Sequence, residues 1–110
     1  MTLSELAAIL EAEIYAGRES LTVEISSGYA SDMLSDVMGH ASRGQVWFTI
    51  QTHPNIAAVA LLLNLAAVVI TGGHQPDPAV VAKAQSESLV LLGTPFSTFE
   101  AIRRLSQAGL

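Results

Sequence analysis

The second half of the chain alternates between short apolar runs and helix-start signals, and this alternation most constrains the fold. Residues 45–50, 66–71 and 89–92 are rich in β-branched and large apolar side chains. Runs of this length without polar alternation are typical of strands buried on both faces. A helix-start signal follows each run: Pro54, the Asp77-Pro78 pair, and Ser97 with Glu100 three residues later. Three strand–helix units in succession predict a parallel sheet covered by helices.

The first half carries weaker signals. Thr2 and Glu5 form a capping-box pattern, which predicts a first helix that ends before Gly17. Residues 13–16 fit either the end of this helix or a short strand. Residues 21–26 alternate apolar and polar side chains and therefore predict a strand that ends at Ser27-Gly28.

A short helix is then expected, capped by Ser31 or Asp32 and closed near Gly39. Taken together, the pattern predicts an α/β fold. We expect a layered, mainly parallel sheet of about four strands flanked by helices, in a single domain over residues 1–110.

The helix expected after Pro54 is apolar on nearly all sides over residues 56–65. One face can cover the sheet, whereas the opposite face must meet another helix or another subunit. Half of the chain is hydrophobic and its mean hydropathy is +0.43, which is more than a monomer of this size needs. We therefore expect a homodimer, with two-fold symmetry as the commonest arrangement.

Charge and composition exclude several classes of function. The net charge is −5, and the five Lys and Arg residues form no run longer than two, which argues against nucleic-acid or anionic-membrane binding. Because the chain has no cysteine, disulfides, thiolate metal sites and cysteine nucleophiles are excluded within it. The longest apolar run, residues 56–70, is interrupted by Asn64 and is shorter than the ~20 residues of a membrane-spanning helix. With no basic leader at Met1, we expect a cytoplasmic protein.

Polar residues and glycines follow the predicted strands, where open α/β sheets bind their ligands. Helices begin directly after two of these segments, and their free amide groups favour anions. The candidate ligand-binding residues are Asp32, Gln51, Thr52, His53, Asn55, Thr71, Gly72, Gly73, His74 and Thr94. The alternative is that these residues only form turns and helix caps, which require the same residue types.

Two further groups of residues do not form a convincing reactive site. The histidines His40, His53 and His74 have no standard metal-ligand spacing, so we expect no metal site. Ser31, Ser35, Asp32, Asp36 and His53 contain the residue types of nucleophilic catalysis, but no nucleophile-elbow motif holds them. We therefore predict no catalytic residue and no cofactor.

The segments at residues 68–77 and 93–100 resemble the DRTGG domain family. In that family a buried strand ends in Thr-Gly-Gly, a Pro-Asp pair opens the next helix and a Thr-Phe pair begins the last one. Residues 71–73, 76–77 and 98–99 match these motifs in order. The resemblance extends over residues 45–108, with one departure. Many members have an Asp-Arg pair after the strand that precedes Gln51, whereas this chain has Thr52 and His53.

The resemblance implies a stand-alone member whose fold is similar to the N-terminal domain of HPr kinase. It implies no kinase activity, because the chain has no G-x-x-x-x-G-K-[ST] phosphate loop. In larger proteins such domains are regarded as regulatory, and similar small members are often encoded near iron-only hydrogenase and signalling proteins.

Two functional hypotheses follow from these observations. The first is a non-enzymatic regulatory module, homodimeric, that binds a small ligand or a partner protein at the strand ends. A nucleotide or another anion is one candidate ligand. The second is a structural adaptor in a hydrogenase or signalling complex, with no ligand of its own.

Overall fold

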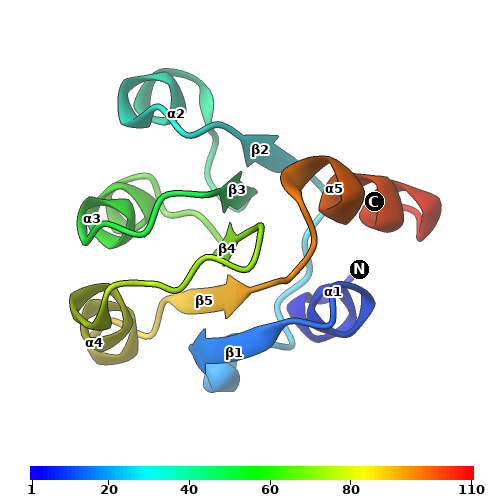
Figure 1. The fold of residues 1–110 in the computed structure, drawn as a ribbon, viewed down its shortest axis with the longest axis horizontal. Helices are drawn as coiled ribbons and strands as arrows, with labels where there is room; N and C mark the ends of the chain where they lie inside the picture. The colour runs from blue at the N-terminus through cyan, green and yellow to red at the C-terminus, as the bar shows by residue number, and fades with distance from the viewer.

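The computed structural model describes all 110 residues and contains one five-stranded sheet (Figure 1). In chain order the elements are α1 (Leu3–Ile9), β1 (Glu13–Ala16), a 3₁₀ turn η1 (Arg18–Ser20), β2 (Gly28–Ala30), α2 (Leu34–His40), β3 (Val46–Thr49), α3 (Asn55–Leu62), β4 (Ala67–Ile70), α4 (Pro78–Ser86), β5 (Val90–Gly93) and α5 (Thr98–Gln107). The strand order across the sheet is β1-β5-β4-β3-β2.

The sheet is mainly parallel, as the alternation of strands and helices predicted. Strands β2, β3, β4 and β5 pair in parallel, and β3 lies directly beside β4 with Thr49 opposite Ile70. Strand β1 joins the edge of β5 antiparallel, with Glu13 opposite Gly93. Residues 13–16 are therefore a strand, which resolves the alternative that the sequence left open. The α/β class is confirmed, with five strands rather than about four.

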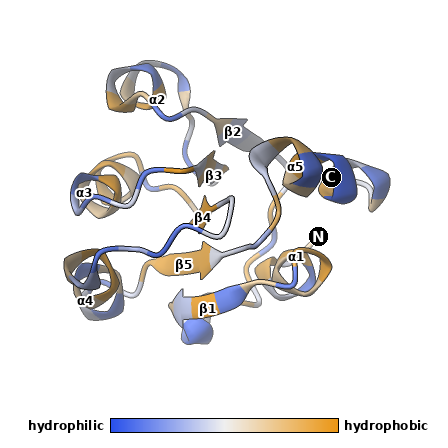
Figure 2. Cartoon of the chain, viewed as in Figure 1, coloured by the Kyte–Doolittle hydropathy of each residue, from blue (hydrophilic) through white to orange (hydrophobic).

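Helices cover both faces of the sheet: α2, α3 and α4 lie on one face, and α1 and α5 on the other (Figure 1). Strand side chains alternate between two cores: Trp47 and Val68 pack on the side of α2, α3 and α4, whereas Phe48 and Val69 pack on the side of α1 and α5. Figure 2 shows the apolar colour on β4 and β5, between these layers. The sheet is thus buried on both faces at its centre, as its unbroken apolar runs require.

Helix α3 is buried on several sides by its neighbours α2 and α4 (Figure 1). Ile56, Val59 and Ala60 are buried, whereas Ala58 and Leu62 are exposed. Most of the apolar surface of α3 is therefore covered within the chain. The part that could meet another subunit is limited to the stripe of Ala58 and Leu62.

The prediction of a strand at residues 21–26 is wrong. Only Ile25 of this segment is buried, and the segment runs along α1, where the Leu3 amide donates to the Val23 carbonyl at 3.0 Å. The strand at this edge of the sheet is instead β2, whose burial is slight. Gly28 permits it, because a Cβ there would lie 2.7 Å from the ring of Phe48.

The cap predicted for the start of α2, Ser31 or Asp32, is also wrong, whereas the helix ends near Gly39 as predicted, at His40. The helix begins at Leu34 after Met33, which makes no side-chain cap, because the carboxylate of Asp32 bonds to β3 instead. The caps predicted for α1, α4 and α5 are present: Thr2, Asp77 and Ser97 each accept a hydrogen bond from a first-turn amide.

None of the helices has both the length and the hydropathy that crossing a membrane would require.

Candidate functional site

The carboxyl ends of β2, β3, β4 and β5 form one rim of the sheet, since these four strands are parallel. The loops after β3 and β4 meet there, because the Asp77 amide donates to the Thr52 carbonyl at 3.1 Å. The sequence predicted that the two strands lie side by side, and the pairing confirms it. The candidate residues nevertheless divide into three groups along this rim.

The first group ties the loop after β2 to the end of β3. One carboxylate oxygen of Asp32 accepts from the Thr49 hydroxyl at 2.9 Å and from the Ile50 amide at 2.8 Å. The side-chain amide of Gln51 donates to the Asp32 carbonyl at 2.9 Å. The polar atoms of Asp32 and Gln51 thus already hold two loops together.

The second group lies at the start of α3. The His53 ring accepts from the Asn55 amide at 3.1 Å, and the Ile56 amide donates to the His53 carbonyl at 3.0 Å. Both His53 and Asn55 have exposed side chains. Because these first amides are bonded within the chain, they do not form a ready anion site.

The third group surrounds the ends of β4 and β5. Thr71 and Thr94 are fully buried, and their hydroxyls bond to the Thr98 hydroxyl at 2.6 Å and the Leu10 carbonyl at 2.7 Å. Gly72 and Gly73 adopt φ angles of +74° and +71°, a backbone conformation in which glycine is free of strain.

This glycine turn directs its amides toward the loop before α5. The Gly72 amide donates to the Phe96 carbonyl at 2.7 Å, and the Gly73 amide donates to the Thr94 carbonyl at 2.9 Å. Both donors are therefore engaged within the protein. The turn fixes the loops that enclose the neighbouring cavity.

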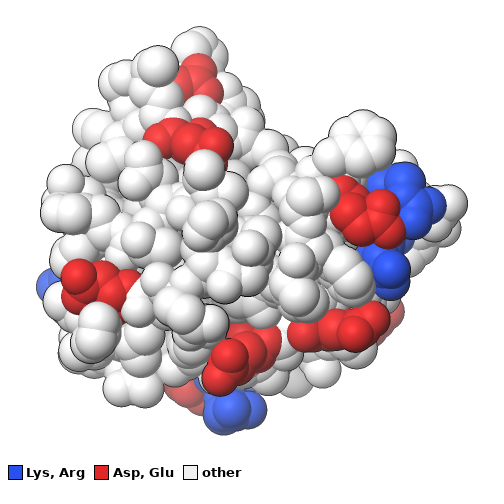
Figure 3. Space-filling model, viewed as in Figure 1, with Lys and Arg blue, Asp and Glu red and all other residues white.

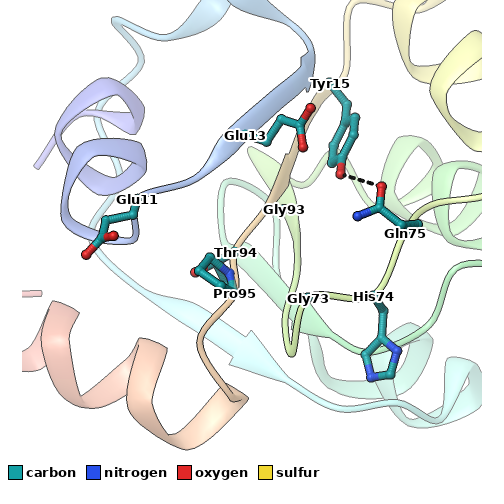
Figure 4. A pocket seen from close by; sticks show the side chains of 9 residues that line it. All are labelled: Glu11, Glu13, Tyr15, Gly73, His74, Gln75, Gly93, Thr94 and Pro95. Atoms are coloured by element: carbon teal, nitrogen blue, oxygen red, sulfur yellow. Dashed lines mark hydrogen bonds between the residues drawn. The ribbon is translucent and has the colours of Figure 1, made fainter.

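A cavity of about 200 Å³ opens beside this turn, between β1 and the loops that follow β4 and β5 (Figure 4). It is lined by Glu11, Glu13, Tyr15, Gly73, His74, Gln75, Gly93, Thr94 and Pro95. The candidate set thus contributes Gly73, His74 and Thr94 to one cavity and leaves its other seven members outside.

Sequence reasoning missed six lining residues, of which two lie in β1: Glu11, Glu13, Tyr15, Gln75, Gly93 and Pro95. Glu13 and Tyr15 reach the cavity because β1 runs antiparallel to β5, which brings the start of β1 to the carboxyl rim. Residues 11–15 contain no local sequence pattern that predicts this pairing. Gln75 was missed although it lies between the Thr-Gly-Gly and Pro-Asp motifs.

Two carboxylates, those of Glu11 and Glu13, line the cavity, and no Lys or Arg does. In Figure 4 the Tyr15 hydroxyl donates to the Gln75 side-chain oxygen at 3.2 Å, with the Glu13 carboxylate beside them. Burial, and then the bond to Glu13, raise the pKa of Tyr15 above its usual value. Glu11 and Glu13 are exposed at the mouth. A ligand that donates hydrogen bonds fits this wall better than an anion does.

The charges around the rim are mostly negative. In Figure 3 acidic side chains are spread along the visible face, whereas the largest basic patch lies at one side, over α5, with smaller ones at the lower and left edges. No three His, Asp or Glu side chains in the chain converge as a metal site.

The sequence model of the DRTGG domain family matches residues 5–108. The chain belongs to the DRTGG domain family. In this DRTGG domain the Thr-Gly-Gly motif is the turn that borders the cavity, and the Pro-Asp motif places Asp77 as the cap of α4. The Thr-Phe motif supplies Thr98, which bonds to Thr71. No curated protein matches the sequence.

A solved structure with the same fold is the crystal structure of the CBS and DRTGG domains of the regulatory region of Clostridium perfringens pyrophosphatase, complexed with the activator diadenosine tetraphosphate. The TM-score is 0.82 and the identity is 22%, over 97% of this chain and 46% of that one. This protein thus spans about half of the length of the pyrophosphatase chain that it matches. The likeness establishes the fold of this DRTGG domain.

Proposed function

We propose that this DRTGG domain is a non-enzymatic regulatory module that acts as a homodimer and binds a small ligand at the carboxyl rim of its sheet. The observation that carries the proposal is the cavity between β1, β4 and β5, where Tyr15, Gln75 and Glu13 present polar atoms side by side. The shared fold with the regulatory region of a pyrophosphatase supports a regulatory role.

The cavity favours the nucleoside part of a nucleotide over its phosphates. The amino group of a base and the hydroxyls of a ribose are donors, and they match the acceptors of Glu13 and Gln75. Phosphates would meet two carboxylates, with the amides of Gly72 and Gly73 already bonded elsewhere. The volume of about 200 Å³ is below the ~300–1,000 Å³ of pockets for larger ligands. We therefore expect one ring system or sugar to enter and any phosphates to stay outside.

Thermal unfolding with added probes tests this proposal. We expect adenosine to raise the melting temperature and inorganic phosphate to leave it unchanged, because a ligand that binds only the folded state stabilises by mass action, by ~2.7 kcal/mol at a hundredfold excess over Kd. Glu13→Gln should abolish the adenosine response without altering the unliganded melting temperature, since Glu13 is exposed. A response to phosphate that survives Glu13→Gln would contradict the proposed ligand chemistry.

The other candidate residues define how far the ligand extends along the rim. Gln51→Ala and His53→Ala should leave adenosine binding intact and lower stability, because the bonds of Gln51 and His53 hold loops and a helix start. Asn55→Ala should leave both unchanged, because only the backbone amide of Asn55 is bonded. Weakened binding by ~0.5–1.5 kcal/mol at unchanged stability would instead place them in ligand contact.

A purely structural adaptor is the second candidate, as in a hydrogenase or signalling complex. The observation that favours it is the exposed apolar side chain of Phe99, which is 79% accessible on α5. An adaptor of this kind shows no response to adenosine or phosphate, so the same thermal experiment separates the two functions.

The non-enzymatic part of the proposal is supported by the acidic groups near β2. The Asp36 carboxylate accepts from the Tyr29 hydroxyl at 2.9 Å, and hydrogen bonds from Ser31 and Tyr29 hold the pKa of Asp36 below its usual value. The Asp32 carboxylate accepts from the Ile50 amide, directly after β3. Both carboxylates are thus engaged in structural bonds.

A further inference from the structure

The outward face of α5 is an apolar surface without a partner in the chain. Ala101 and Leu105 bury the inner face of the helix, whereas Phe99 is 79% exposed and Ile102 is 39% exposed on the outer face. Phe99, Ile102 and Ser106 follow one another at the i, i+3, i+7 spacing of a single helix face. Because the aromatic ring of Phe99 is large and exposed at the start of the helix, we expect another surface to cover it.

A depression lies next to the Phe99 ring on the same face. It has a volume of about 350 Å³ and is bordered by Phe99, Ile102, Arg103, Ser106 and Gln107. Four of these residues have the i, i+3, i+4, i+7 relation of the hole that receives a side chain in helix–helix packing. The small side chain of Ser106 keeps the far end of the hole open. The face therefore carries both a projecting side chain and a space to receive one.

We propose that this face docks on the α5 helix of a second copy of the chain, antiparallel to it. The inference rests on the homodimer of the proposed function and names its surface. Helix α5 spans Thr98–Gln107, so a two-fold axis through its centre passes between Ile102 and Arg103. Residues equally far from this point then face each other. Phe99 meets the partner's Ser106, at the open end of the depression, and the arrangement is repeated by symmetry.

The charges on α5 are compatible with this pairing. Arg103 donates two hydrogen bonds to the Glu100 carboxylate, at 2.8 and 2.6 Å, and Arg104 donates a third at 3.0 Å. Near the two-fold axis each Arg103 lies within about one helical turn of both Glu100 and the partner's Glu100. The two Arg103 side chains approach each other beside the two-fold axis, but each guanidinium is already paired with the Glu100 carboxylate of its own helix, which offsets their mutual repulsion.

Further apolar surface for such a contact lies directly beside α5. A groove of about 420 Å³ runs between α5 and β2, lined by Tyr29, Phe48, Ile102 and Leu110 among others. A ten-residue helix is only ~15 Å long, and a stable interface buries ~800 Å² on each partner. The helix pair alone falls short of this area, so the proposed contact must extend from α5 into the groove. The corresponding stripe on α3 offers only Ala58 and Leu62.

Disulfide trapping tests the position of the axis, because the chain has no cysteine of its own. We expect Arg103→Cys to form a covalent dimer in high yield on mild oxidation, since residue 103 lies beside the two-fold axis. The matched control is Leu62→Cys, which is also exposed, on α3, and should remain monomeric in denaturing electrophoresis. Trapping through Leu62→Cys and not Arg103→Cys would overturn the assignment to α5.

Sedimentation equilibrium at micromolar concentration provides the second readout. The unmodified chain should sediment as a dimer, Phe99→Asp as a monomer with unchanged circular dichroism, and Leu62→Asp as a dimer. A dimer that survives Phe99→Asp would overturn this interface but leave the homodimer of the proposed function intact. A monomeric unmodified chain would overturn both, while adenosine binding would still be measurable on it.

Discussion

Three threonines at the ends of parallel strands account for all of the buried polar side chains. Thr49, Thr71 and Thr94 follow or end β3, β4 and β5, and each is at most 2% exposed. Their hydroxyls bond respectively to Asp32, Thr98 and the Leu10 carbonyl. Two of them belong to the candidate ligand set, but each hydroxyl instead fastens a segment from elsewhere in the chain to the rim.

Thr94→Val removes one of these hydroxyl groups while the side-chain volume stays nearly constant. It leaves the Leu10 carbonyl and the Phe96 amide without their bonds to Thr94, so we expect a loss of ~1–3 kcal/mol in the free energy of unfolding. Urea denaturation measures this loss. Thr52→Val is the matched control, because Thr52 contributes its backbone carbonyl to the fold and its change should be small. Equal effects at both positions would contradict the structural role of the Thr94 hydroxyl.

Glu100 makes the stability of α5 dependent on pH in acid. Bonds from Arg103, and then from Arg104, lower the pKa of Glu100 from 4.5 to about 2. A carboxyl whose pKa is lowered by folding stabilises the folded state above its unfolded pKa, and this contribution disappears as the pH falls from about 4.5 toward 2.

We therefore expect Glu100→Gln to lower the melting temperature at pH 6 and to have progressively less effect as the pH falls through that window. The Glu100→Gln chain and the chain that keeps Glu100 should both carry Phe99→Asp, so that dissociation of a dimer contributes to neither melting curve. A difference in melting temperature that stays constant from pH 6 to pH 2 would rule out the Glu100 ion pair as its cause.

At the scale of elements, the junction after β1 depends on Gly17. Its φ is +85°, and a Cβ there would lie 2.5 Å from the Cα of Val90 in β5. Gly17→Ala should therefore destabilise the chain by more than ~1 kcal/mol, because both the backbone conformation and the contact with β5 are disturbed.

Gly39→Ala is the control for this substitution. A Cβ at Gly39, in α2, meets nothing within 4 Å, so alanine there should stabilise the helix by roughly 0.5–1 kcal/mol. Urea midpoints of the two variants should move in opposite directions. A shift of the Gly17→Ala midpoint toward higher urea would refute the close contact with β5.

The elements from residue 45 onward could be predicted because their burial and their local signals agree. Trp47 and Phe48 face different cores, so β3 is apolar without alternation, and Asp77 caps α4 as its sequence indicates. The first half is different. Residues 21–26 alternate like a strand but lie along α1, whereas Gly28–Ala30 becomes a strand through its pairing with β3. Edge strands are set by such tertiary contacts more than by their own residues.

At the scale of the whole molecule, the rim of the sheet could be predicted but the cavity could not. Topology alone brings the loops after β3 and β4 together, because parallel neighbours end on the same side. The cavity also needs Glu13 and Tyr15, which reach it through an antiparallel strand from the far end of the sequence. Long-range pairing of this kind leaves no local pattern in the sequence from which it could be predicted.

The pairing of β1 with β5 also sets an order of events during synthesis. Strand β1 leaves the ribosome early, but its neighbour in the sheet, β5, is made only after most of the chain, since Glu13 pairs with Gly93. Closing so long a loop is costly until the intervening strands are in place, and contacts of this range slow folding. The nascent chain therefore carries β1 without its partner strand until β5 has been synthesised.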